Sequence, residues 1–262
     1  MADRDANDSE LLILEILRDQ GFTADKIPES NEGRTPDLFA EDPVGLRYLI
    51  EVRDKFPSDG EVEERQTAFD ADGVFTKTES HDSENRYFGI VDDKVDQLTS
   101  PLAPEADLRL VCLVSVVRDG EYRTARMRST LCGERLLVDL DTGITTPCFY
   151  FGHSSFYTHR EVLDGGLTVD AKGVSLIVNS PYSPNADLLR QSALARVLAG
   201  GVCDPAELEA RGLAFLADTP LPRGRQAEGQ VLRYVQQKHG VPRLSPMRRR
   251  SFVGEALVRR NA

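Results

Sequence analysis

The sequence lacks the features of several common protein classes. Its longest apolar stretch, around Leu110 to Val117, is far shorter than the ~20 residues needed to span a bilayer. The first residues are acidic and have no apolar core, so we expect no secretory signal. The four cysteines are widely spaced without a Cys-x-x-Cys pair, which favours reduced thiols in a cytoplasmic protein over a disulfide framework.

Three catalytic signatures are also missing. No glycine-rich loop is followed by Lys-Ser or Lys-Thr, and no serine lies in a Gly-x-Ser-x-Gly elbow. His153 and His159 have no cysteine or carboxylate at the spacing of a zinc site. The sequence therefore disfavours phosphate-loop, serine-hydrolase and structural-zinc chemistry.

Basic residues are scarce overall but not everywhere. The 262-residue chain, long enough for one large domain or two small ones, has 43 acidic and 32 basic residues and a net charge of −11. Residues 1–100 contain 26 acids and 11 bases, whereas residues 223–262 contain 10 bases and 2 acids. The total argues against non-specific binding to nucleic acid, whereas a basic tail on an acidic body is typical of a nucleic-acid-facing segment. Chance differences between solvated faces explain the asymmetry equally well.

The hydrophobic pattern of the first half predicts a compact α/β unit with the element order helix, three strands, helix, strand. Its predicted elements are a helix over 8–19, strands over 22–28, 35–41 and 46–55, a helix over 85–100 and a strand over 107–118. The last strand is the most apolar and is expected at the centre of a sheet. Residues 56–85 are polar and acidic, and we expect a long loop there.

The second half predicts strands followed by helices, either extending the first sheet or forming a separate lobe. The expected strands are 121–131, 135–140, 146–151 and 173–179, and the expected helices are 187–198, 204–212 and 227–239. We therefore expect a core over residues 1–118 and a C-terminal extension over 119–262, basic from about residue 223.

The sequence Asp42-Pro43-Val44-Gly45 predicts a turn that joins the strands over 35–41 and 46–55 into a hairpin. Two carboxylates fall on the adjacent strands of this hairpin. Asp37 follows Pro36 on one strand, and Glu51 precedes Val52 and Arg53 on the next. Two carboxylates with a neighbouring cation suit Mg²⁺ and a phosphate substrate, because Mg²⁺ takes one or two carboxylates and keeps several waters. The sequence therefore predicts a metal-dependent phosphate chemistry at this hairpin.

These residues carry a resemblance to a known family. Thr35-Pro36-Asp37-Leu38, followed by Ile50-Glu51-Val52-Arg53 on the expected elements, resembles the PD-(D/E)XK nuclease superfamily. The resemblance covers residues 8–118 and implies a restriction-endonuclease-like core with a mixed central sheet flanked by helices. It also implies that phosphodiester bonds are cut with Mg²⁺ or Mn²⁺.

The resemblance assigns roles to several residues. Asp37 and Glu51 would be metal ligands, with the Val52 carbonyl as a further ligand and Glu10 as an outer or second-metal ligand. The family's usual lysine is Arg53 here, and Lys94 on the second predicted helix, three residues before Gln97, would supply that charge instead. Lys55, on the same strand face as Arg53, is a lesser candidate.

The function implied by the resemblance is a nuclease, most naturally for DNA, in a restriction or anti-phage defence setting. Many family members are homodimers or parts of larger complexes, so a partner subunit is expected. The alternative is a catalytically degenerate nuclease-like fold that binds protein or nucleic acid, which the arginine at position 53 favours.

Each candidate also has a simpler interpretation. Asp37 could begin a strand or cap a turn, and Glu51 could form a plain salt bridge with Arg53 or Arg47. Glu10 could act only on the helix dipole, and Lys94 could be a solvated charge beside neighbouring aspartates. The Arg248-Arg249-Arg250 run could contact phosphates or remain a solvated tail.

Overall fold

A computed structural model describes residues 6–54, 59–71, 73–80, 85–117, 120–224, 226–247 and 250–256. The helices are α1 (Ala6–Asp19), α2 (Asp59–Asp70), α3 (Asn85–Leu98), α4 (Gly120–Cys132), α5 (Ser155–Thr158), α6 (Ala186–Gln191), α7 (Ala193–Val197), η1 (Ala199–Gly201), α8 (Pro205–Ala210) and α9 (Glu228–His239). No described helix is both long and apolar enough to cross a membrane.

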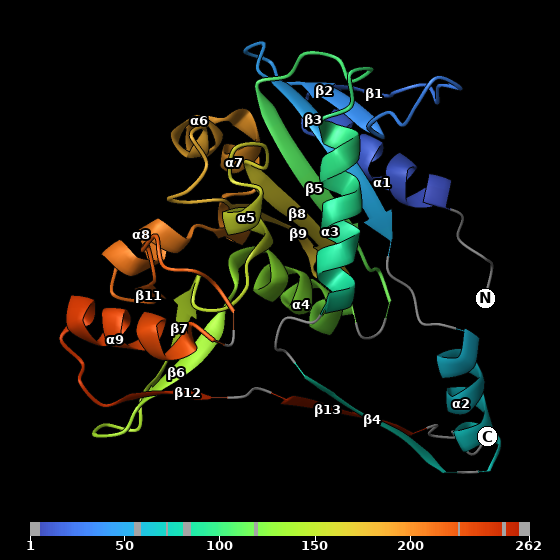
Figure 1. Cartoon of the computed structure of the whole chain (residues 1–262). Helices are drawn as coiled ribbons and strands as arrows, with labels where there is room; N and C mark the ends of the chain where they lie inside the picture. Colours follow the sequence, from blue (N-terminus) through green and yellow to red (C-terminus); the bar gives the residue numbers. More distant parts are fainter. Residues whose placement is uncertain are drawn as a thin grey trace.

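The strands form one large sheet and two smaller ones (Figure 1). The strands are β1 (Thr23–Lys26), β2 (Leu38–Glu41), β3 (Arg47–Asp54), β4 (Val74–Ser80), β5 (Leu108–Val114), β6 (Arg135–Asp139), β7 (Thr145–Phe149), β8 (Gly165–Asp170), β9 (Gly173–Val178), β10 (Val202–Cys203), β11 (Phe215–Leu216), β12 (Leu244–Met247) and β13 (Arg250–Ala256). The fold is thus mixed α/β, as the sequence predicts.

The large sheet is mixed and has the strand order β1-β2-β3-β5-β8-β9-β10. β1, β2 and β3 pair antiparallel, β3, β5 and β8 pair parallel, and β9 runs antiparallel to β8. The most apolar strand, β5, lies between β3 and β8 and is buried along almost its whole length, which confirms its predicted central place. The sheet thus combines strands from both halves of the chain.

The predicted turn between β2 and β3 is held by one buried carboxylate. Asp42 Oδ1 accepts hydrogen bonds from the backbone N–H groups of Val44 and Leu46, each at 3.0 Å. Gly45 has a φ of 87°, a left-handed conformation that suits glycine. This turn fixes the register in which Leu38 lies opposite Ile50, and therefore places Asp37 beside the middle of β3.

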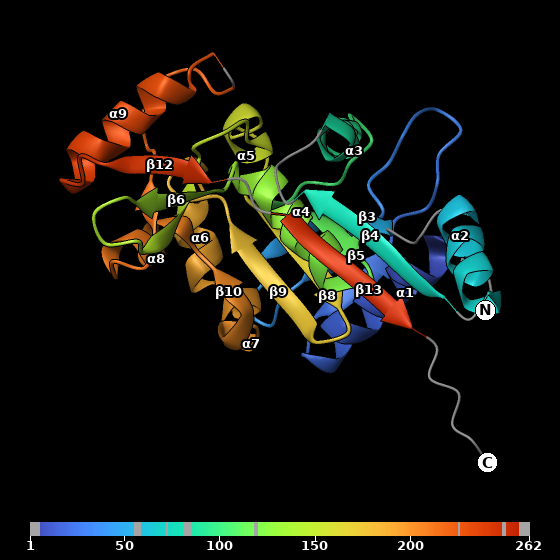
Figure 2. The same ribbon diagram turned by 90° about the horizontal axis from the view of Figure 1, so that it is seen from below.

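Helices cover both faces of the large sheet (Figure 2). On one face, α3, α4 and α5 pack on alternate residues of the central strands, such as Leu49, Val111 and Ile177. On the other face, α1, α6 and α7 pack on the intervening residues, such as Ile50 and Leu110. Because Glu51 alternates with Ile50, its side chain lies on the face that α3 covers.

A C-terminal lobe, defined here as β6, β7, β11, β12, α8 and α9, adjoins the α4 side of the large sheet. Its four strands have the order β11-β7-β6-β12. Its buried residues, including Leu137, Phe149 and Val231, belong to the same apolar cluster as those of α3 and α4. The lobe is therefore joined to the rest by a continuous core.

The segment between β3 and α3 departs from the predicted loop. Its described parts form α2 and β4, and β4 pairs antiparallel along its whole length with β13 (Figure 2). Glu61 of α2 ion-pairs with Lys77 of β4 at 3.0 Å and with Arg123 of α4 at 3.3 Å. Arg65 of α2 lies 3.5 Å from Glu255 of β13. The segment contains few apolar residues, so its own sequence gives little signal for regular structure. These ion pairs and the pairing with a distant strand hold α2 and β4 in place.

Two predictions for the second half are wrong. Residues 121–131 are helical in α4, because this helix buries polar side chains such as Thr124, Ser129 and Thr130 and so shows no clean apolar stripe. The single helix expected over 187–198 is divided at Ser192, whose side chain caps α7 by accepting a hydrogen bond from the Ala195 N–H.

Candidate functional site

Asp37 ends the loop that connects β1 to β2. The Ile27 N–H donates to the Asp37 carbonyl oxygen at 2.9 Å and closes this loop. Asp37 Oδ2 accepts a hydrogen bond from the Val52 N–H at 2.7 Å, so the carboxylate is fixed against β3. The hairpin thus brings Asp37 next to Glu51 and Val52, as its predicted register requires.

Glu51 is fully buried in the middle of β3, with an exposed fraction of 0%. Desolvation and the nearby charge of Asp37 raise its pKa to about 8, although Lys94 opposes this shift. Within the part of the chain that the structure describes, Glu51 Oε1 has no hydrogen-bond partner. A buried carboxylate oxygen without a partner is costly, so this environment favours either the protonated form of Glu51 or a bound cation.

Lys94 reaches the two carboxylates from α3. Its Nζ lies 2.6 Å from Glu51 Oε2 and 3.3 Å from Asp37 Oδ2. The stripe of Tyr87, Val91, Val95 and Leu98 fixes α3 on the sheet and turns Lys94 toward β3. The lysine predicted as a substitute for Arg53 is therefore in contact with both predicted ligands.

The side chains of the other predicted residues of β3 do not lie beside the two carboxylates. Arg53 shares the strand face of Glu51 but is exposed beyond it, near the end of the strand. The Val52 side chain is buried in the opposite core cluster, and its backbone N–H is the group that contacts Asp37. Lys55 lies outside the described residues.

Glu10 lines a pocket that also contains Asp37. Its carboxylate ion-pairs with Lys26 of β1 at 2.7 Å. Glu10, Lys26, Asp37 and Gln97 line this pocket, whose volume is about 280 Å³. Lys26 is not among the residues that the sequence predicts for the site. The available signal was its rarity, as one of six lysines, on the strand that follows the helix of Glu10.

The two carboxylates fit a divalent oxygen-seeking ion better than zinc. Among the residues that the structure describes, no group of three or more histidine, cysteine, aspartate or glutamate side chains is arranged to hold a metal. Mg²⁺ needs only one or two carboxylates because water and substrate complete its shell. Asp37 and Glu51 supply the two carboxylates, and Glu51 Oε1 has no hydrogen-bond partner among the described residues.

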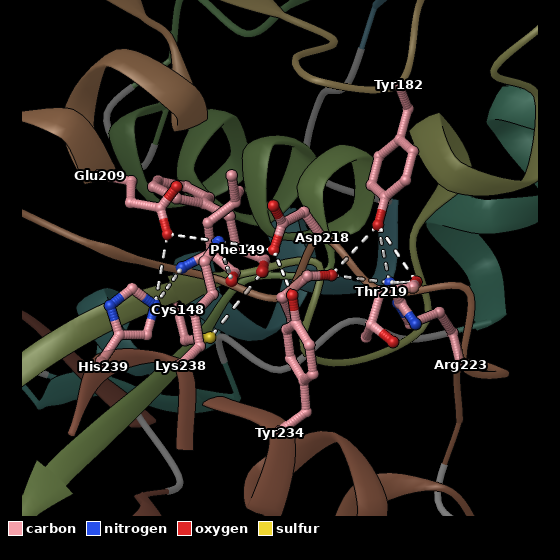
Figure 3. Close-up of polar contacts among 12 residues, drawn as sticks. Cys148, Phe149, Tyr182, Glu209, Asp218, Thr219, Arg223, Tyr234, Lys238 and His239 are labelled. Carbon is pink, nitrogen blue, oxygen red and sulfur yellow. Dashed lines mark hydrogen bonds and ion pairs between the residues drawn. The ribbon is translucent and has the colours of Figure 1, made fainter. Parts of the chain in front are cut away.

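A second lysine lies between two carboxylates in the C-terminal lobe (Figure 3). Lys238 Nζ of α9 lies 2.5 Å from Asp218 Oδ1 and 2.6 Å from Glu209 Oε1. The Tyr234 hydroxyl donates to Asp218 at 2.8 Å, and His239 Nε2 lies 3.3 Å from Glu209. These contacts join α8, the segment after β11 and α9, so we assign the cluster a structural role.

The arginines predicted as phosphate contacts lie next to and within β13 in the sequence. Arg248 and Arg249 lie outside the described residues, and Arg250 begins β13.

Comparisons with known proteins identified no relative of this chain. No protein-family model matches the chain, and neither the curated proteins nor the solved structures contain a match.

Proposed function

We propose that this protein is a Mg²⁺-dependent phosphodiesterase that cleaves nucleic acid. The observation that carries the proposal is the convergence of Asp37, Glu51 and Lys94, with Glu51 fully buried and one of its oxygens unpartnered among the described residues. Burial of an acid beside another acid is unfavourable for folding, and perturbed groups of this kind concentrate at functional sites.

Asp37 and Glu51 would hold Mg²⁺ or Mn²⁺, with the Val52 carbonyl as a further ligand. When bound, the ion would lower the pKa of a coordinated water and offset the charge of the phosphate. The Val52 N–H orients Asp37 at 2.7 Å, so the carboxylate keeps its position without the ion. Glu10, in the adjoining pocket, would act as an outer acid, held in place by Lys26.

Lys94 would take the role that the nuclease superfamily gives to the lysine at position 53. Its ammonium contacts both carboxylates, so it is already at the place where the phosphate would bind. There it would donate hydrogen bonds to the attacking water and stabilise the charge that develops on phosphate oxygens. Arg53, exposed further along β3, would contact the substrate backbone instead.

The element order α1, β1–β3, α3, β5 supports a restriction-endonuclease-like core, with α2 and β4 inserted between β3 and α3. DNA is the proposed substrate, cut by a homodimer or a larger complex in the cytoplasm. A restriction or anti-phage role is the proposed setting, and this part rests on the family resemblance alone.

A catalytically inactive binding module is the second candidate. The observation that favours it is the position of Lys94, which already neutralises the two carboxylates at 2.6 and 3.3 Å. In that case the three residues would form a buried ion-pair cluster with no bound ion.

One experiment separates the two candidates. The purified protein is incubated with plasmid, linear and single-stranded DNA and with RNA, in Mg²⁺, Mn²⁺ or EDTA, beside Asp37→Ala, Glu51→Ala and Asp218→Ala. Asp218→Ala is the matched control, because it removes a carboxylate from the other lysine cluster.

The nuclease proposal predicts metal-dependent cleavage that Asp37→Ala and Glu51→Ala abolish and Asp218→Ala retains. Cleavage that survives both site substitutions contradicts the site. Nucleic-acid binding without cleavage of any substrate in either metal supports the binding module.

A further inference from the structure

Arg34 lies in the loop between β1 and β2, shortly before Asp37. Both residues line the pocket of about 280 Å³ beside the candidate site. Arg34 is exposed, and within the part of the chain that the structure describes its guanidinium has no hydrogen-bond or ion-pair partner. It is therefore a free cation in the same pocket as a predicted metal ligand.

The loop backbone on both sides of Arg34 is held in place. The Thr35 hydroxyl donates to the Pro28 carbonyl at 3.3 Å, and Ser30 pairs with Gly33 in a short antiparallel bridge. The ends of the loop are joined by the backbone hydrogen bond already described. A ligand that binds the Arg34 side chain therefore does not have to order the loop that carries it, which lowers the entropic cost of binding.

The other cations around the site are engaged by acids. Lys26 lies 2.7 Å from Glu10, and Lys94 contacts both carboxylates of the candidate site at 2.6 and 3.3 Å. Glu29, the remaining acid of the pocket, makes no ion pair with Arg34. A divalent ion at the candidate site would add positive charge beside the pocket, so the surroundings of Arg34 would then attract an anion.

Phosphate is the anionic group that a nucleic-acid substrate presents along its whole backbone. A guanidinium binds phosphate with several N–H donors in a planar fork, and its charge is permanent. The phosphate that is cut would lie at the ion, so the free arginine beside it suits a phosphate further along the same backbone.

From these observations we infer that Arg34 is a substrate-binding residue that holds a backbone phosphate flanking the one that is cut. This inference rests on the proposed function and adds a contact from the loop between β1 and β2 to the one proposed for Arg53 of β3.

The salt dependence of DNA binding tests the inference without requiring cleavage. A short fluorescein-labelled duplex and the corresponding single strand are titrated with the protein in Ca²⁺, and anisotropy gives the affinity at several KCl concentrations. The variants are Arg34→Gln and Arg34→Lys. The matched control is Arg211→Gln, which removes an exposed arginine at the end of α8 that likewise has no side-chain partner among the described residues.

Loss of one phosphate contact should lower the slope of log affinity against log salt by about 0.9 for the duplex, or about 0.7 for the single strand. Arg34→Gln should therefore show this smaller slope and bind about tenfold more weakly near 0.1 M salt. Arg34→Lys and Arg211→Gln should retain the slope and stay within about twofold in affinity. In cleavage assays, Arg34→Gln should raise KM and leave kcat within about twofold, because Arg34 does not touch the reacting atoms.

An unchanged slope in Arg34→Gln, an equal decrease in Arg211→Gln, or no binding of either DNA overturns the inference. Metal-dependent cleavage that requires Asp37 would still support the nuclease proposal in that event. Conversely, the expected change in slope without cleavage of any substrate would contradict the nuclease and retain the phosphate contact. The two failures are therefore distinguishable.

Discussion

Lys94 and Lys238 each lie between two carboxylates, but the two clusters differ in how well their acids are satisfied. In the C-terminal lobe, Asp218 has Lys238 and the Tyr234 hydroxyl as partners. In the large sheet, Glu51 is fully buried and its Oε1 has no hydrogen-bond partner among the described residues. In the Lys238 cluster, Glu209 Oε1 also has two ion-pair partners, Lys238 and His239. The same residue types therefore give carboxylates of different environments in the two places.

The pKa shifts of the two acids run in opposite directions. Burial opposes ionisation of Asp218, but the hydrogen bonds from Lys238 and Tyr234 outweigh it and lower its pKa. For Glu51, burial and the charge of Asp37 outweigh Lys94 and raise the pKa to about 8. Partners, rather than burial alone, thus decide which cluster favours its charged form. On the proposed function, this difference would distinguish a site that takes a metal ion from a structural cluster.

The largest predicted effect concerns the two lysines. Lys94→Met should reduce the cleavage rate about 10²–10³-fold, because it removes the cation next to the reacting phosphate. Lys238→Met should leave the rate within about threefold, since its cluster is structural. Single-turnover cleavage assays measure both. Equal losses in the two variants, at equal thermal stability, would contradict the comparison.

The next prediction concerns pH and stability. Because the pKa of Glu51 is raised from 4.5 to about 8, its stabilisation of the fold is present below 4.5 and is lost as pH rises through about 8. Glu51→Gln should remove this loss, which we expect to be a few kcal/mol. Urea unfolding in EDTA across this range measures it.

Asp218 should show the reverse dependence. Its pKa is lowered from 3.8, so its stabilisation is present above that value and is lost as pH falls through the folded pKa. Asp218→Asn should therefore flatten the acid limb of the stability profile and leave the limb near pH 8 unchanged. If Glu51→Gln and Asp218→Asn changed the dependence of stability on pH in the same way, the proposed difference between the two clusters would be wrong.

A smaller effect is expected from metal binding. Mg²⁺ at about a hundred times its dissociation constant should stabilise the protein by ~2.7 kcal/mol, because the folded state alone presents the site. Thermal unfolding with and without Mg²⁺ measures this as an increase in Tm. Asp37→Ala should abolish the increase and Asp218→Asn should retain it. An increase retained by Asp37→Ala would place the ion elsewhere.

The smallest effect concerns Arg53. Arg53→Lys should change the cleavage rate by less than about threefold, because Lys94 already provides the ammonium at the carboxylates. Single-turnover kinetics again provide the measurement. A large gain in rate would mean that the residue at position 53, and not Lys94, limits catalysis.

Local patterns predicted the elements that position the site. The Asp42 turn and the alternation in β3 are encoded within a few residues, so the proximity of Asp37 and Glu51 followed from the hairpin. The contact of Lys94 required the packing angle of α3 on the sheet, which its apolar stripe implies only approximately. The sequence alone did not decide whether Lys94 is solvated or is directed at Glu51.

Other features depend on contacts between distant residues and have no local signal. The Glu10–Lys26 pair needs the relative placement of α1 and β1. The helix α4 is stabilised by burial against β8 despite a weak apolar pattern, and β4 is completed by β13 from the other end of the described chain. Tertiary contacts override local preference in these segments.

The pairing of β4 with β13 has a consequence for the order of assembly. β4 belongs to the connection between β3, which carries Glu51, and α3, which carries Lys94. Its hydrogen-bonding partner is made only after the ribosome has translated the C-terminal lobe. The connection between the two halves of the candidate site therefore lacks its neighbouring strand until residues 250–256 have been translated.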